Sequence, residues 1–405
     1  MTAAAAADRR RRFRLRLLVG FLVLLCLAYA KQFATSPTVG QDFRAFFAGA
    51  TLLRQGGDPY DWSQLGGTEA ALYNAPNHLA PGDPRFYDFH PLAEGPWLYL
   101  ALAPLAGWPW RLAYAVWACV IVVLVTTGAW LILRQVGFRH RDLHLALVVT
   151  LLSPIAFLGL FFGQATPVIF AAFAIGWALA ARGRPALAGV ILAATWVKPN
   201  VGIVVPLIVA LVVPRSTRQL AVGYATGSLV AYAVALAALG GRLVDWPVAI
   251  LGFWRSNQGP QPDIASWHSF YYPLLAGWPR TVVLGLALAA VGAYSVWSWR
   301  RLGRGTAVGL TVLLLWIGGL PFVHSFDLLI LLPVVAMLVG PSLRGLADPW
   351  VETTVWAFVL LPLLYFVGLH IGPFNGFSAI PVALTAWAWH RRIVAPSRAP
   401  LEMAA

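Results

Sequence analysis

The chain leaves its first hydrophobic span at Gly40-Gln41-Asp42-Phe43-Arg44-Ala45-Phe46-Phe47-Ala48-Gly49, and the rest of the sequence is organised around this stretch. Its apolar residues recur at three- and four-residue spacing, which predicts a helix over residues 43–55 with one apolar face. Gly56-Gly57 predicts the end of that helix, and Asp58-Pro59 a turn. Asp42 has two interpretations: an N-cap that accepts hydrogen bonds from free backbone N–H groups, or an acid that takes part in chemistry.

The composition excludes an ordinary soluble domain. Hydrophobic residues make up 60% of the sequence and charged residues only 11%, and apolar runs long enough to span a bilayer recur throughout. We therefore predict an all-α membrane protein, a polytopic helical bundle. The two cysteines, Cys26 and Cys119, both lie inside apolar spans, so the sequence predicts neither a disulfide framework nor a metal site. No cofactor is predicted.

We predict about twelve transmembrane helices in a single polytopic domain over residues 16–392, with a basic N-terminus at 1–15 and a tail at 393–405. The expected spans are 16–35, 112–133, 143–162, 165–181, 185–197, 199–213, 219–239, 280–299, 305–321, 326–341, 350–369 and 375–390.

The arginines predict the orientation of these spans. With the N-terminus inside, twenty of the 27 arginines and five acids face the cytoplasm, whereas nine basic and ten acidic residues lie outside. Both termini are therefore expected in the cytoplasm. The net charge of +14 belongs to the inner membrane face, and no nucleic-acid partner is predicted.

Two long segments fall on the outer side, residues 36–111 and 240–279. Within the first, residues 92–106 are apolar but short and bounded by prolines. A crossing here would leave Arg134–Arg141 outside, so we interpret 92–106 as an interfacial or re-entrant segment next to outer juxtamembrane helices. A thirteenth span is the alternative.

The unusual polar residues gather on this outer face, which predicts a cavity open to that side. Asp42 is placed to act as a general base. Lys198, at a helix break before Pro199, is either a point charge for a phosphate or a lysine that snorkels to the interface. His324 and Asp327 are three residues apart, so they either meet on one helix face or form an N-terminal cap with an ion pair. The other candidates for binding are Arg44, Gln164, Asn200 and His268.

Several motifs resemble those of glycosyltransferase family 87. Asp42-Phe43-x-x-Phe46-Phe47-Ala48-Gly49 with Gly57-Asp58-Pro59-Tyr60 resembles the N-terminal signature of that family. The resemblance continues, in the same order and up to about residue 335, through Phe89-His90-Pro91-Leu92, Gly163-Gln164-Ala165-Thr166-Pro167, Ala188-Gly189, Thr195-Trp196-Val197-Lys198-Pro199 and Pro321-Phe322-Val323-His324-Ser325-Phe326-Asp327. His90 stands where the family often has Tyr or Pro, and Ala165-Thr166 where it often has Asn.

The resemblance implies a C-type membrane glycosyltransferase fold in a bacterial plasma membrane, with its active site on the outer face. It also implies a polyprenyl-phosphate sugar donor, a glycolipid or polysaccharide acceptor, and a metal-independent, inverting reaction. On this basis Asp42 would be the general base, Lys198 and His324 would bind the donor phosphate, and the transferred sugar would be a hexose, mannose above all, in an α-1,2 linkage.

Two alternatives remain at the level of sequence. An arabinofuranosyl donor would suit the same family. A lipid-linked-sugar transporter or flippase would also show many spans and broken helices, but it should carry ionisable groups at the midplane of several spans. The spans of this chain are nearly free of charge, which favours the transferase.

Overall fold

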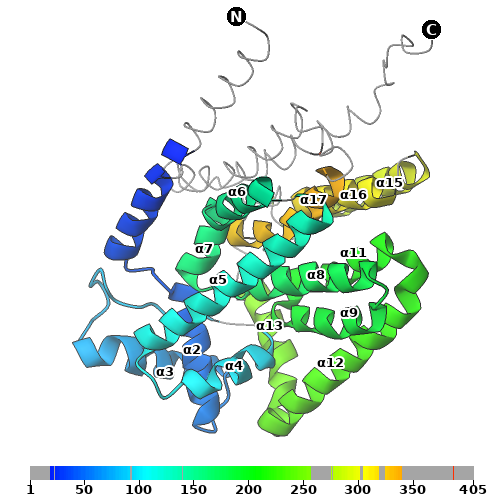
Figure 1. Cartoon of the computed structure of the whole chain (residues 1–405). Coiled ribbons are helices and arrows are strands. Elements are labelled where there is room, and N and C mark those ends of the chain that lie inside the picture. The colour runs from blue at the N-terminus through cyan, green and yellow to red at the C-terminus, as the bar shows by residue number, and fades with distance from the viewer. Residues whose placement is uncertain are drawn as a thin grey trace, which may run out of the picture.

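The computed structural model describes residues 19–21, 23–91, 94–138, 140–256, 275, 277–301, 304–318, 324–339 and 386. The regular elements in these ranges are helices, and none is a strand. This agrees with the predicted helical membrane protein (Figure 1).

Among the described residues, three helices are long and apolar enough to cross a membrane: Trp110–Gln135, Thr217–Phe253 and Trp278–Arg301. The first is α5 and the last is α15, whereas the middle one joins α12 (Thr217–Leu239), η6 (Gly240–Val244) and the start of α13 (Asp245–Ser256). The expected loop 240–279 is therefore helical up to Ser256.

A fourth crossing is formed if two bent helices count as one. The span expected at 143–162 is interrupted: α6 (His140–Leu151) and α7 (Pro154–Phe162) meet at an angle of 47°. Pro154 is the first residue of α7 and has no N–H to continue the α6 hydrogen bonds, and the Ser153 side chain caps the new helix.

Shorter apolar helices fill the rest of the bundle. They are Val19–Thr35, α8 (Thr166–Ala181), α9 (Pro185–Leu192) with η4 (Ala193–Val197), α10 (Pro199–Gly202) with α11 (Val204–Val212), α16 (Arg304–Gly318), and η7 (Ser325–Ile330) with α17 (Leu331–Val339). The break predicted at Lys198-Pro199 is confirmed, since η4 ends and α10 begins there. The expected spans 350–369 and 375–390 lie outside the described residues, apart from Ala386, and the count of twelve stays a prediction.

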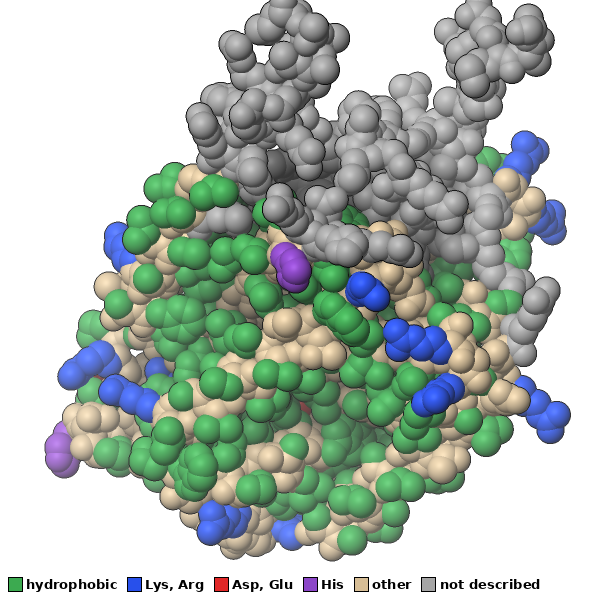
Figure 2. All heavy atoms as spheres, in the orientation of Figure 1, with side chains coloured by type: hydrophobic (Ala, Val, Ile, Leu, Met, Phe, Trp, Pro, Cys, Tyr) green, Lys and Arg blue, Asp and Glu red, His purple; other side chains and the backbone are tan. Residues whose placement is uncertain are grey.

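The helices of the central bundle pack in chain order. Figure 1 shows α8 between α5 and α9, with α12 against the other side of α9. Hydrophobic side chains dominate the face shown in Figure 2, as expected of a surface that meets lipid.

The segment expected on the outer side folds into short helices: α2 (Gln41–Arg54), α3 (Trp62–Glu69), the π-helix η1 (Ala70–Asn74), η2 (Ala75–Asn77), and α4 (Pro96–Leu102) with η3 (Ala103–Leu105). The apolar helix Pro96–Leu105 is ten residues, about 15 Å at ~1.5 Å per residue. That is about half the hydrocarbon thickness of a bilayer, in keeping with a segment that does not cross.

The α2 helix is buried far more completely than its periodicity predicted. One apolar face was expected, but nearly every residue from Asp42 to Leu52 is buried, because α3, α4, α5 and α7 surround the helix. Gly49 allows α4 to pack closely against α2, since a Cβ there would press on the Tyr99 ring.

Of the two predictions for the ends of α2, the one for the C-terminal end is confirmed and the one for the N-terminal end is wrong. Gly57 N–H donates to the Leu52 carbonyl at 2.9 Å and Gly56 has a φ of 80°, so the glycine stop is confirmed. The N-cap interpretation of Asp42 is wrong. Gly40 holds that position with a φ of 66°, and no side chain caps the helix.

Gly223 provides a test of the bundle packing. A Cβ at Gly223 would meet the Ala186 carbonyl oxygen, because α9 and α12 are in backbone contact there. We expect Gly223→Ala to lower the free energy of unfolding by about 1–3 kcal/mol, the usual cost of overpacking. Thermal unfolding in detergent measures this. Gly285→Ala is the matched control, since nothing lies within 4 Å of Gly285 in α15, and equal melting temperatures for the two variants would contradict the close crossing.

Candidate active site

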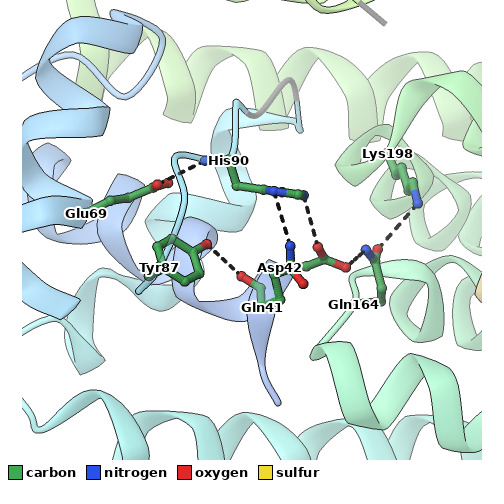
Figure 3. Close-up of polar contacts among 7 residues, drawn as sticks. All are labelled: Gln41, Asp42, Glu69, Tyr87, His90, Gln164 and Lys198. Carbon is green, nitrogen blue, oxygen red and sulfur yellow. Dashed lines mark hydrogen bonds and ion pairs between the residues drawn. The ribbon is translucent and has the colours of Figure 1, made fainter. Parts of the chain in front are cut away.

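Four segments that are far apart in the sequence bring polar side chains together. Asp42 is the second residue of α2, Gln164 lies in the turn between α7 and α8, Lys198 lies between η4 and α10, and Asp327 lies in η7. All four are buried, and each contacts the next. Figure 3 shows Gln164 between Asp42 and Lys198.

Asp42 has a side-chain nitrogen next to each carboxylate oxygen. The Gln164 amide nitrogen Nε2 donates a short hydrogen bond to Oδ2, and His90 Nε2 lies 3.5 Å from Oδ1. Burial raises the pKa of the Asp42 carboxyl, whereas His90, the Gln164 hydrogen bond, Lys198 and His324 oppose that rise. Such a carboxyl suits a general base, because its charged form is stabilised by fixed donors while its proton affinity is increased by burial.

Gln164 is placed by the glycine before it. Gly163 ends α7 with a φ of 72°, and a Cβ there would press on Phe43. The Gln164 N–H donates to the Gly159 carbonyl at 2.9 Å, and the Trp117 indole donates to the Gly163 carbonyl at 2.8 Å. These contacts fix the backbone at Gln164, independently of the hydrogen bond between its side chain and Asp42.

Lys198 is neither a free charge nor a snorkelling lysine. Its side chain is only 7% exposed, and Nζ lies 2.8 Å from Asp327 Oδ1 and 3.3 Å from Gln164 Oε1. Nζ also sits 4.6 Å from the centre of the Phe326 ring, a cation–π contact. The snorkelling interpretation is wrong, and the charge is compensated by Asp327.

Asp327 accepts hydrogen bonds from three groups. In addition to Lys198, the Thr166 hydroxyl donates to Oδ1 at 2.5 Å and the His324 backbone N–H donates to Oδ2 at 3.1 Å. The last contact is the N-terminal cap expected for the pair His324 and Asp327, but the ion pair is made with Lys198. The His324 ring stacks on Phe326 with centroids 5.0 Å apart.

Of the other candidates, Arg44 is engaged elsewhere and His268 lies outside the described residues. Arg44 points away from Asp42: its Nη2 donates to the Pro37 carbonyl at 3.2 Å, and its guanidinium lies 4.4 Å from the centre of the Trp110 ring. Asn200 is the second residue of α10. His268 lies outside the described residues.

His90 is the residue of the site that the sequence candidates missed. It was quoted only as part of Phe89-His90-Pro91-Leu92, and nothing in its spacing points to Asp42. Its backbone N–H donates to Glu69 Oε2 at 3.0 Å, and its ring Nδ1 lies 3.5 Å from the Gln41 amide nitrogen (Figure 3). Burial raises the pKa of the Glu69 carboxyl to about 8, although the His90 N–H opposes that rise.

The charged side chains of the site fall into an ion pair and a separate carboxylate. Lys198 and Asp327 neutralise each other, which leaves the Asp42 carboxylate with two histidines near it, His90 and His324. In the described part of the chain, no group of three or more His, Cys, Asp or Glu side chains could hold a metal ion. The residues named above form a buried, hydrogen-bonded cluster around the Asp42 carboxylate.

Comparison with known proteins identifies the family. The sequence model of glycosyltransferase family 87 matches residues 95–325, more than half of the chain, and this region contains Gln164, Lys198 and His324. A search of curated proteins found no match. The match agrees with the motif resemblance and with the helical membrane structure, and the chain belongs to glycosyltransferase family 87.

Proposed function

We propose that the protein transfers a hexosyl residue, mannosyl above all, from a polyprenyl-phosphate sugar to a glycolipid or polysaccharide acceptor. The observation that carries this proposal is the buried Asp42 carboxylate, which receives N–H groups from Gln164 and His90 where four segments meet. A glycosyltransferase needs a base near the acceptor hydroxyl. Of the two carboxylates in this cluster, Asp327 is paired with Lys198, whereas Asp42 has a histidine, His90, at ion-pair distance.

The reaction is a single displacement. Asp42 takes the proton of the acceptor hydroxyl while the hydroxyl oxygen attacks the anomeric carbon of the donor. The bond between that carbon and the phosphate oxygen breaks, and the lipid phosphate leaves with the electron pair. Attack in line with the departing group inverts the configuration, and no metal enters the mechanism that the family resemblance implies.

The departing phosphate requires positive or hydrogen-bonding groups. Lys198 and His324 are the candidates from the sequence. Because Asp327 already compensates Lys198, we assign His324 the closer role and Lys198 the role of holding Gln164 and supplying part of the field. The influence of His324 on the Asp42 carboxyl supports a position near the reacting atoms.

We place the reaction at the outer face of the plasma membrane. The arginine distribution assigns the starts of α2, α8, α10 and η7 to that side, and these are the segments that contribute Asp42, Gln164, Lys198 and Asp327. Polyprenyl-phosphate sugars and envelope acceptors in a bacterial plasma membrane would meet the enzyme there.

The test uses purified full-length protein in detergent or proteoliposomes, with membrane lipid extract as the acceptor source. Radiolabelled polyprenyl-phosphate mannose and polyprenyl-phosphate arabinofuranose are supplied in separate reactions. We expect label from the mannosyl donor in a lipid or polysaccharide product, and at least about 100-fold less of it with Asp42→Asn. Transfer from the arabinofuranosyl donor alone would replace the sugar assignment, and movement of intact donor across sealed proteoliposomes without transfer would favour a flippase.

A further inference from the structure

His90 differs from the other partners of Asp42 in its access to solvent. Its side chain is 40% exposed, whereas that of Asp42 is 12% exposed. The ring contacts Asp42 through Nε2 and Gln41 through Nδ1, each at 3.5 Å. It therefore stands at the edge of the site, with one nitrogen directed at the carboxylate (Figure 3).

The Gln41 contact favours one tautomer of the neutral His90 ring. The Gln41 amide nitrogen is a donor, so Nδ1 of a neutral imidazole accepts from it and the proton lies on Nε2. The Nε2–H group then faces Asp42 Oδ1. A carboxylate with N–H donors on both oxygens is stabilised in its charged form.

The chain around His90 is tied to the start of α2. Asn74 and Tyr87 exchange two hydrogen bonds, of 2.9 and 2.8 Å, and the Tyr87 hydroxyl donates to the Gln41 carbonyl at 2.9 Å. The Glu69 carboxyl then accepts the His90 N–H at 3.0 Å. The loop is anchored at Tyr87, three residues before His90, and at the backbone of His90 itself, so the ring is held toward Asp42.

We propose that His90 is the positioning residue of the Asp42 base: its Nε2–H group holds Oδ1 and keeps the buried carboxyl in the charged form that accepts a proton. This inference rests on the proposed role of Asp42 and deepens it. His90 itself makes no bond to substrate, and its effect is exerted through Asp42.

Other titratable groups also act on this pair. Those that face Asp42 or His90 are the Tyr87 hydroxyl, Lys198, His324 and Glu69, with Asp327 behind Lys198. Of the contacts to Asp42 described above, the one to Oδ1 comes from His90, whose side chain is 40% exposed. Removing the N–H group of His90 takes away a contact with the charged form of Asp42, so the pKa of Asp42 rises. As the pH is lowered, Asp42 is then protonated at a higher pH and stops accepting protons sooner.

The experiment follows the protonation of Asp42 directly. Infrared difference titration of the full-length protein records the carbonyl absorption of protonated carboxyls, and the band lost in Asp42→Asn is assigned to Asp42. His90→Leu removes the ring N–H. His90→Gln places an amide N–H near the position of Nε2, but this amide cannot be protonated. His144→Leu is the matched control, because His144 is exposed on α6, away from the site.

We expect the Asp42 midpoint to rise by about one pH unit in His90→Leu and to return most of the way in His90→Gln. The acid limb of the pH–rate profile should move with it, so that turnover falls about tenfold on the acid side and recovers at high pH. His144→Leu should leave both measurements unchanged.

Two results would overturn the inference. An unchanged Asp42 midpoint in His90→Leu would mean that the ring does not stabilise the carboxylate, and turnover lowered equally at every pH would assign His90 a purely structural role. Neither result would affect the proposed function, which is tested separately: if Asp42→Asn kept wild-type transfer, Asp42 would not be the base, whatever the infrared titration gave for His90.

Discussion

Asp42→Asn is expected to lower turnover by roughly 100- to 10,000-fold, the range that general base catalysis contributes, with the fold intact. Asparagine keeps the size of the side chain, and its carbonyl oxygen can still accept the N–H of Gln164 or His90. It cannot take a proton from an acceptor hydroxyl. Because Gly40 and not Asp42 is the N-cap of α2, the substitution also removes no helix cap.

Turnover and thermal stability are measured on the same preparation of Asp42→Asn and compared with those of the wild type. Asp61→Asn is the matched control, since Asp61 caps α3 through the Ser63 and Gln64 N–H groups and asparagine caps about as well as aspartate. We expect that variant to keep both activity and melting temperature. Wild-type turnover in Asp42→Asn would remove Asp42 from the mechanism and leave Asp58 or Asp327 as the base.

Lys198→Ala is expected to lower the free energy of unfolding by about 3–5 kcal/mol, because it leaves the Asp327 carboxylate buried without its charged partner. The Thr166 hydroxyl and the His324 N–H stay in place, but neither carries a compensating charge. Unfolding in detergent measures the loss. Lys31→Ala is the control, since Lys31 is the only other lysine in the sequence and is exposed.

The double variant Lys198→Met with Asp327→Leu separates stability from donor binding. Replacing both charges by apolar residues of similar size often restores stability. We expect the melting temperature to recover while the apparent KM for the donor stays raised, if Lys198 acts on the phosphate. Recovery of the donor KM together with stability would assign Lys198 a structural role only. A Lys198→Ala protein as stable as the wild type would contradict the buried ion pair.

The local features of the fold could be predicted from the sequence. The end of α2 at Gly56-Gly57 and the break at Lys198-Pro199 follow from residues that restrict or free the backbone at their own positions. The helical class follows from the length of the apolar runs. Pro154 also predicts a helix break, but it lies within a long apolar run, and a single span was therefore expected at 143–162.

The chemistry of Asp42 could be predicted only in part. An acid just after a membrane span can be an N-cap or a base, and the local sequence is the same in both cases. What separates them is the partner of the carboxylate, and Gln164 lies 122 residues away in the chain. Lys198 shows the same limit, since the Asp327 that neutralises it is 129 residues away.

The sequence by itself determined a helical membrane protein of glycosyltransferase family 87 whose unusual polar residues lie at helix ends. It did so because hydropathy, arginine placement and backbone-restricting residues act over one or two helical turns. The tertiary structure alone decided that α2 is buried on every side, that Lys198 is paired and that His90 faces Asp42. Burial and ion pairing depend on distances between segments, which the packing of the helices sets.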